Sequence, residues 1–101
     1  MKKGMEFTIE FEGVKEDEKW KDANYTSPIQ NCINEQPFPI TNVGFYEDTG
    51  NFVIVGEIIR LTKKECEAEY TIFKEKMKRI LKSYGLKKTI DRMKLYFDTI
   101  H

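Results

Sequence analysis

The sequence contains few of the residues from which metal sites and disulfide frameworks are built. Among 101 residues there are one histidine, His101, and two cysteines, Cys32 and Cys66. A zinc site needs three or four convergent Cys, His or carboxylate ligands, so we expect no metal and no cofactor. The two thiols can in principle form a disulfide. Buried free thiols are the usual state in an intracellular protein, and we predict that state here.

Long apolar runs are also missing. No stretch approaches the roughly 18 apolar residues of a membrane-spanning helix. The basic residues 1–4 are followed at once by strand-like alternation, where a signal peptide needs an apolar block. We therefore expect a cytoplasmic location and no membrane partner.

The patterns of common catalytic sites are absent too. The single histidine, His101, has no neighbours that would position it as the base for a nucleophile. Gly44, Gly50 and Gly56 fall in a hairpin pattern and form no phosphate-binding loop. We predict no catalytic residues and a protein that is not an enzyme.

The composition that is present supports a single domain over residues 1–101. Apolar residues make up 40% of the chain, aromatic residues 13% and charged residues 34%, which suits one core under a highly charged surface. The charges are unevenly distributed: residues 1–59 carry a net charge of −6 and residues 60–101 a net charge of +6. This split predicts an acidic and a basic region on the surface.

The first half of the chain predicts one strand and two short helices. Residues 5–12 alternate between apolar and polar side chains, which indicates a half-buried strand with an acidic outer face. Residues 15–22 are compatible with a surface helix anchored by Trp20. Ser27 and Pro28 fit the N-cap and first position of a helix over about 28–34.

A hairpin follows. Residues 42–47 and 51–61 flank a turn that Gly50 can close by adopting a positive φ. The second arm is apolar on both faces for most of its length. Such a strand is typically central in a sheet or part of a subunit contact.

Two amphipathic helices are predicted after the hairpin, near 63–84 and 87–100. Thr62 can cap the first helix, Glu65 completes a capping box, Leu61 can pack onto Cys66, and Gly85 is a natural stop. Apolar residues at spacings of three and four define a buried stripe on each helix. The first stripe comprises Cys66, Tyr70, Phe73, Met77, Ile80 and Tyr84, and the second Leu86, Ile90, Met93, Phe97 and Ile100.

The predicted fold class is α+β. It has a three-stranded antiparallel sheet with the two C-terminal helices packed mainly on one face, in the order β-(α)-β-β-α-α. The middle of this order resembles part of a ferredoxin-like split βαβ arrangement, with a helix in place of the fourth strand.

Acidic side chains form the first candidate partner surface. They project from the strand at 5–12 and continue into the segment after it. They can dock onto a basic partner, or they can protect an exposed strand from edge pairing. The residues are Glu6, Glu10, Glu12, Glu16, Asp17 and Glu18.

The weakly charged segment 24–42 forms the second candidate surface. Its only charged residue is Glu35. The composition suits a contact surface, and alternatively its apolar members pack under the sheet as a satellite core. The candidate contact residues are Tyr25, Asn31, Asn34, Gln36 and Phe38.

Basic side chains of the two predicted C-terminal helices form the third candidate surface. They can neutralise phosphates of RNA or DNA, or they are an ordinary solvated helix face. The excess of lysine over arginine and the interspersed glutamates favour the solvated face. The residues are Lys74, Lys78, Arg79, Lys82, Lys87, Lys88 and Arg92.

No motif defines a reaction, so the predicted function depends on separated charge. We expect a small non-enzymatic protein that occupies a surface on another protein, in the class of inhibitors, immunity proteins and phage-type or mobile-element antagonists. A homodimer is a related possibility, since opposite charges on two regions suit pairing of two copies. The alternative is an RNA- or DNA-binding accessory domain.

Overall fold

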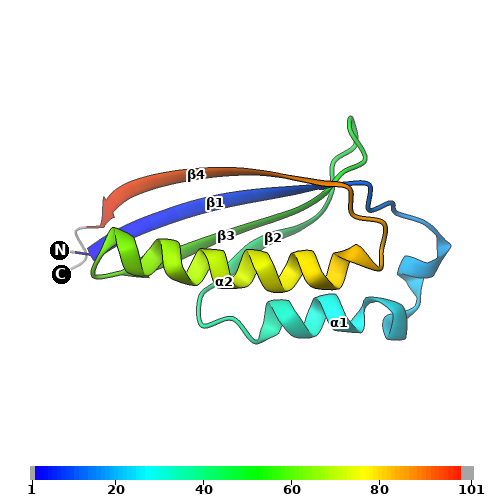
Figure 1. Cartoon of the computed structure of the whole chain (residues 1–101), viewed down its shortest axis with the longest axis horizontal. Coiled ribbons are helices and arrows are strands. Elements are labelled where there is room, and N and C mark those ends of the chain that lie inside the picture. Colours follow the sequence, from blue (N-terminus) through cyan, green and yellow to red (C-terminus); the bar gives the residue numbers. More distant parts are fainter. Residues whose placement is uncertain (1, 99–101) are drawn as a thin grey trace.

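The computed structural model describes residues 2–98, which fold into an α+β domain with a four-stranded antiparallel sheet (Figure 1). The strand order is β2-β3-β1-β4. The predicted class is confirmed, but the sheet has one strand more than expected. Along the chain the elements are β1 (Lys2–Glu12), the 3-10 helix η1 (Glu18–Lys21), α1 (Ala23–Asn34), β2 (Ile40–Phe45), β3 (Phe52–Arg60), α2 (Lys63–Lys82) and β4 (Lys88–Asp98).

The predicted helix over 87–100 is wrong, because residues 88–98 form the edge strand β4. The strand pairs with β1 along its whole length, from Lys88 opposite Glu12 to Asp98 opposite Lys2. Apolar residues happen to recur here at helical spacing. Thr89, Ile90 and the aromatic residues nevertheless favour a strand, and the open edge of β1 supplies a hydrogen-bonding partner. Residues 99–100 of the predicted helix lie outside the described residues.

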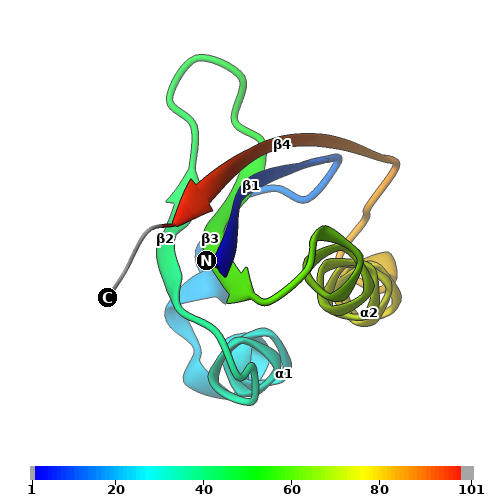
Figure 2. The same ribbon diagram turned by 90° about the vertical axis from the view of Figure 1, so that its left-hand side faces the viewer.

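Helices α1 and α2 pack on the same face of the sheet (Figure 2), whereas the prediction placed two C-terminal helices there, of which only α2 exists. The other face carries no helix, and the β2–β3 hairpin rises on that side (Figure 2). With β4 in place, the element order is β-α-β-β-α-β, the ferredoxin-like order that the middle of the sequence resembles. Among the described residues, neither helix is long and apolar enough to cross a membrane.

The core lies between the sheet and α2. From β1 it takes alternate side chains, and β3 lies in the middle of the sheet, as its two apolar faces predict. The predicted stripe of α2 is buried from Cys66 to Met77, and Ile80 and Tyr84 pack against the same core. Thr62 caps α2 by accepting from the Glu65 backbone N–H at 3.1 Å. The predicted packing of Leu61 onto Cys66 is wrong, because Leu61 is 68% exposed.

Helix α1 begins five residues before the predicted start at 28. Asp22 caps it by accepting from the Asn24 N–H at 2.9 Å, so Ser27 is not the cap and Pro28 lies inside the helix. A proline there leaves the carbonyl four residues earlier without its usual donor. The Ser27 hydroxyl donates to that Asn24 carbonyl at 3.2 Å, which compensates for the missing bond.

The predicted helix over 15–22 shortens to η1, which Asp17 caps. Its anchor is Trp20, as expected. The indole packs on Phe45 at 5.0 Å between ring centroids and on Phe52 at 5.3 Å. This aromatic contact ties the segment after β1 to the base of the β2–β3 hairpin.

Candidate functional site

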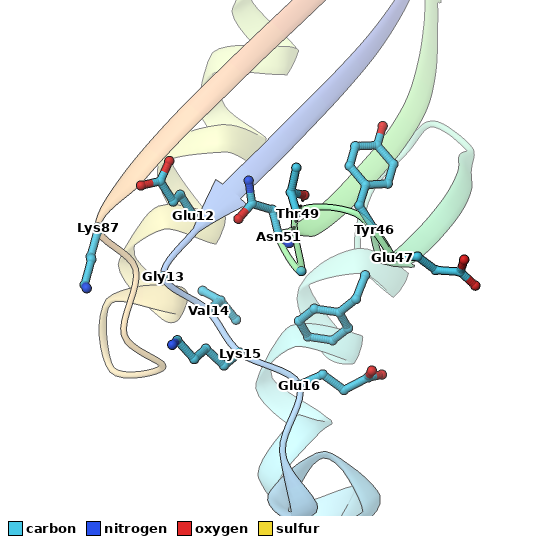
Figure 3. A pocket seen from close by; sticks show the side chains of 12 residues that line it. Glu12, Gly13, Val14, Lys15, Glu16, Tyr46, Glu47, Thr49, Asn51 and Lys87 are labelled. Carbon is cyan, nitrogen blue, oxygen red and sulfur yellow. Dashed lines mark hydrogen bonds between the residues drawn. The ribbon is translucent and has the colours of Figure 1, made fainter.

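A cleft with a volume of about 580 Å³ lies at one end of the sheet. We call it the rim cleft. The segment after β1, the β2–β3 hairpin and the start of β4 form its walls. Figure 3 shows Thr49 and Asn51 on the hairpin wall, with Val14 and Lys15 facing them from the segment after β1. Its size is in the range of small-molecule sites.

Two turns at glycine residues shape this end of the sheet. Gly13 turns the chain out of β1 with φ of 101°, and Gly85 turns it out of α2 with φ of 98°, as predicted for a left-handed stop. The Lys87 backbone N–H then donates to the Glu12 carbonyl at 2.8 Å. As a result Lys87, which begins the approach to β4, stands beside Glu12 at the wall of the rim cleft (Figure 3).

A buried carboxylate holds the hairpin wall in position. Glu10 is only 4% exposed although it lies on the face of the sheet that no helix covers. Its Oε1 accepts from the Asn51 amide at 2.8 Å and from the Thr49 hydroxyl at 3.5 Å. Its Oε2 pairs with Arg92 of β4 at 3.3 Å. Through its carboxylate, Glu10 links its own strand β1 to the hairpin and to the edge strand β4. It also fixes the orientation of the Thr49 and Asn51 side chains in the cleft.

The cleft combines a small apolar floor with polar walls. Val14 is buried, and the half-buried Phe45 ring is fixed by its contacts with Trp20 and Phe52. Around this floor lie carboxylates, ammonium groups, the Asn51 amide and the hydroxyls of Thr49 and Tyr46. Such a site can hold a polar organic molecule through several hydrogen bonds. Across residues 2–98 there is no group of three His, Cys, Asp or Glu side chains that could hold a metal ion.

The predicted acidic surface is interleaved with cations. On the face of the sheet without helices, Glu6 stands opposite Lys94, and Glu12 stands opposite Lys88. Glu10 is buried and paired with Arg92. Glu12 and Glu16 line the rim cleft, whereas Asp17 caps η1 and Glu18 pairs with Lys21 at 3.2 Å. The charge separation seen along the sequence is therefore lost where β4 pairs with β1.

Most of the predicted contact residues in 24–42 serve the fold. Phe38 is buried between Phe7 and Phe73, and Tyr25 packs on Trp20 and Tyr84. The Gln36 amide donates to the Cys32 carbonyl at 2.7 Å. Asn31 and Asn34 are exposed on α1. The apolar members of the segment thus form the satellite core that was the alternative expectation.

The predicted basic residues divide into two groups. Lys74 pairs with Asp91 at 2.9 Å and Arg92 pairs with Glu10, so both are engaged within the fold. The remaining five are brought together in one cleft between α2 and β4, and they are Lys78, Arg79, Lys82, Lys87 and Lys88. This convergence depends on β4 being a strand.

Asp91 fastens the edge strand to α2. Its carboxylate accepts from Lys74 at 2.9 Å and from the Tyr70 hydroxyl at 3.0 Å. The hydrogen bond from Lys74, with the bond from Tyr70, holds the pKa of Asp91 below its ordinary value. Burial and the neighbouring Asp91 charge raise the pKa of Tyr70. A tyrosine with a raised pKa stays protonated, so its hydroxyl acts here as a hydrogen-bond donor that fastens β4 to α2.

The two cysteines are free and buried, as predicted. Burial raises the pKa of both thiols above the usual value for cysteine. The Cys66 thiol lies against the backbone carbonyls of Lys3 and Ile58 at 3.5 and 3.6 Å. Neither thiol lies in the rim cleft.

Sequence reasoning missed most of the rim cleft. It singled out Glu12, Glu16 and Lys87, each for another role, and interpreted the hairpin turn only as a turn. The sequence does have a run of polar residues beside the hairpin turn. Surface loops in general are polar, so this run does not distinguish a binding site from an ordinary loop. The missed residues are Val14, Lys15, Phe45, Tyr46, Glu47, Thr49 and Asn51.

No protein-family model matches the chain, and no significant match is found among curated proteins. Solved structures do share its fold. The aminopeptidase PepT of Bacillus cereus ATCC 10987 is 13% identical with a TM-score of 0.53, over 99% of this chain. This chain spans 32% of that aminopeptidase.

Two smaller proteins are also similar. A putative antibiotic biosynthesis monooxygenase from Nitrosomonas europaea is 19% identical with a TM-score of 0.47, over 94% of this chain and 90% of that protein. A monooxygenase from the gene ActVA-Orf6 of Streptomyces coelicolor, in complex with Nanaomycin D, is 14% identical with a TM-score of 0.43, over 98% and 90%. At these identities the likeness is one of fold, and the named reactions belong to those proteins.

The structure corrects the predicted function. The prediction of a non-enzymatic inhibitor or antagonist is wrong, and so is the prediction that the protein is not an enzyme, because both depended on separated charge and on missing motifs, and the charge separation is lost in the folded sheet. The alternative of a nucleic-acid-binding accessory domain is withdrawn with it. The acidic strand β1 and the basic strand β4 lie side by side and their charges alternate, so no separate acidic region remains on the sheet. The chain therefore belongs, by fold, with ferredoxin-like α+β domains.

Proposed function

We propose that the protein binds a polar organic small molecule, as ligand or substrate, in the rim cleft. The observation that carries this proposal is the cleft of about 580 Å³ whose polar wall is held by the buried Glu10. A binding site gains affinity when its polar groups are oriented before the ligand arrives. Thr49 and Asn51 meet that condition, because Glu10 fixes both side chains.

The lining defines the kind of molecule that fits. Val14 and Phe45 offer a small apolar surface, and Asn51 and Thr49 offer hydrogen-bonding groups to the same cleft. Carboxylates and ammonium groups both stand at the mouth, so the site favours a compound with several hydrogen-bonding groups over a purely apolar one. The expected ligand is a compact polar metabolite with a short apolar portion.

A thermal-shift screen of polar metabolites, followed by calorimetric titration of the compounds found, tests the proposal. Replacing Lys15 and Glu16 together by alanine should weaken binding at least about tenfold, because both exposed side chains line the cleft. The matched control replaces Lys63 and Glu67, an exposed pair on α2, by alanine and should leave affinity unchanged. Finding no saturable ligand, or an equal effect in the control, would contradict the proposal.

A further inference from the structure

The cleft between the C-terminal half of α2 and the start of β4 has a volume of about 390 Å³ and a strongly positive lining. We call it the cationic cleft. We propose that it is a second binding site, for a small anion that carries phosphate groups. Five cations and a single carboxylate, Glu75, line it, with Leu86 and Thr89 between them. The cations are Lys78, Arg79, Lys82, Lys87 and Lys88.

Most of these cations lack a carboxylate partner. Lys78 is 3.6 Å from Glu75, which is the only ion pair in the cleft. Arg79, Lys82, Lys87 and Lys88 form no ion pair within the described part of the chain. Like charges in one concave surface repel one another and focus a positive potential into it. An anion in the cleft relieves that repulsion.

Two separate elements build the cluster. On α2, Lys78 and Lys82 are one helical turn apart, and Arg79 is next to Lys78. Lys87 and Lys88 form the opposite wall of the cleft, because the chain turns at Gly85 and β4 starts opposite Glu12. Leu86 is half-buried and Thr89 supplies a hydroxyl group. The cleft therefore offers charge, one hydroxyl and a small apolar surface to the same molecule.

The surroundings favour a compact anion over a nucleic-acid strand. The neighbouring cations Lys74 and Arg92, which would extend a basic tract, are engaged by Asp91 and Glu10. Beyond Lys88 the surface carries the carboxylate of Glu12. Of the nearby cations on α2, Lys76 lies outside the cleft, in a pocket that also contains Glu35. Lysine is a common point-charge partner of phosphate. A diphosphate or a phosphomonoester of a small organic molecule fits this chemistry.

Calorimetric titration of the full chain with inorganic pyrophosphate, at constant ionic strength set by chloride, tests the proposal. We expect saturable binding with one site. The double variant K82Q/K87Q should weaken it at least about tenfold, because it removes two of the unpaired charges. Both side chains are exposed, and circular dichroism checks that the variant folds. The matched control is K64Q, an exposed lysine in the first turn of α2 outside the cleft, and it should change affinity less than about twofold.

Three results would overturn the proposal. The first is no saturable binding of pyrophosphate. The second is an equal loss in K64Q and K82Q/K87Q, which would mean general charge attraction. The third is binding of a single-stranded oligonucleotide that is tighter than pyrophosphate and equally sensitive to K82Q/K87Q, which would mean a nucleic-acid surface. Lys87 lines both clefts, but of the two Lys15 and Glu16 line only the rim cleft, so the K15A/E16A variant should bind pyrophosphate normally and separates the two sites.

Discussion

Gly13 and Gly85 pack backbone against backbone where the chain leaves β1 and where it leaves α2. A Cβ atom on Gly13 would overlap the Gly85 carbonyl oxygen, and a Cβ on Gly85 would lie 3.1 Å from the Gly13 carbonyl oxygen. Both residues have positive φ. The contact places the segment after β1 beside the start of β4, and so it shapes both clefts.

Replacing Gly13 by alanine should therefore destabilise the protein strongly. The positive φ alone costs about 1–2 kcal/mol for a residue with a Cβ, and the overlap with Gly85 adds to it. We expect a loss of about 3 kcal/mol in the free energy of unfolding, measured by urea denaturation.

Two other glycines are internal controls for this prediction. Gly50 has φ of 72° but open space at its Cβ position, so G50A should cost only about 1 kcal/mol. Gly44 has neither restriction, and G44A should lie within about 0.5 kcal/mol of the wild type. If G13A were no more destabilising than G50A, the backbone contact would not matter to stability.

The buried stripe of α2 gives a second prediction. Phe73 is fully buried against Phe7 and Phe38, so F73A should cost about 3–5 kcal/mol of unfolding free energy. Ile72, its neighbour in sequence, is 57% exposed, and I72A should cost less than about 0.5 kcal/mol. Similar losses in the two variants would show that α2 is rotated relative to the sheet.

The Asp91 contact predicts a pH dependence. Because Lys74 and Tyr70 hold its pKa low, the folded state keeps the carboxylate ionised at pH values where the unfolded chain binds a proton. Its contribution is complete above about pH 4 and is lost as the pH falls through the lowered pKa of the folded state. The stability difference between wild type and D91N should be constant from about pH 7 to 5 and shrink below about pH 4. A difference that grows toward low pH would contradict this assignment.

Thiol reactivity gives a further prediction. Both thiols are buried and have raised pKa values, so alkylation by iodoacetamide at about pH 8 should be at least about a hundredfold slower in the native protein than in urea. Cys32 lines a shallow pocket between α1 and α2, whereas Cys66 is fully enclosed. Mass spectrometry should therefore find Cys32 modified first. Rapid modification of Cys66 would mean that α2 separates readily from the sheet.

Much of the fold could be predicted, because strong local patterns coincide with the tertiary structure. The alternation of β1 and the α2 stripe from Cys66 to Met77 each specify one element with one buried face, and Gly50 marks the turn between β2 and β3. Strand β4 could not be recognised in the same way. Its residues fit a helix and a strand almost equally, and only the open edge of β1, far away in sequence, decides between them.

The candidate sites also depend on residues 88–98 forming the strand β4. Lys87 and Lys88 join Lys78 and Lys82 only when residues 88–98 form a strand, and Arg92 reaches Glu10 for the same reason. The rim cleft has no sequence motif, because three separate segments each contribute ordinary loop residues. Charge counted along the sequence was misleading, since sheet pairing places the two signs next to each other.

The proposed occupant of the rim cleft is a polar small molecule. The most direct test is a two-dimensional ¹⁵N–¹H NMR titration with the tightest compound from the metabolite screen. We expect the largest amide shifts on Gly13, Lys15, Thr49, Gly50 and Asn51, which meet at that cleft. Shifts concentrated on α1 and the outer face of α2, with those five amides unmoved, would contradict it.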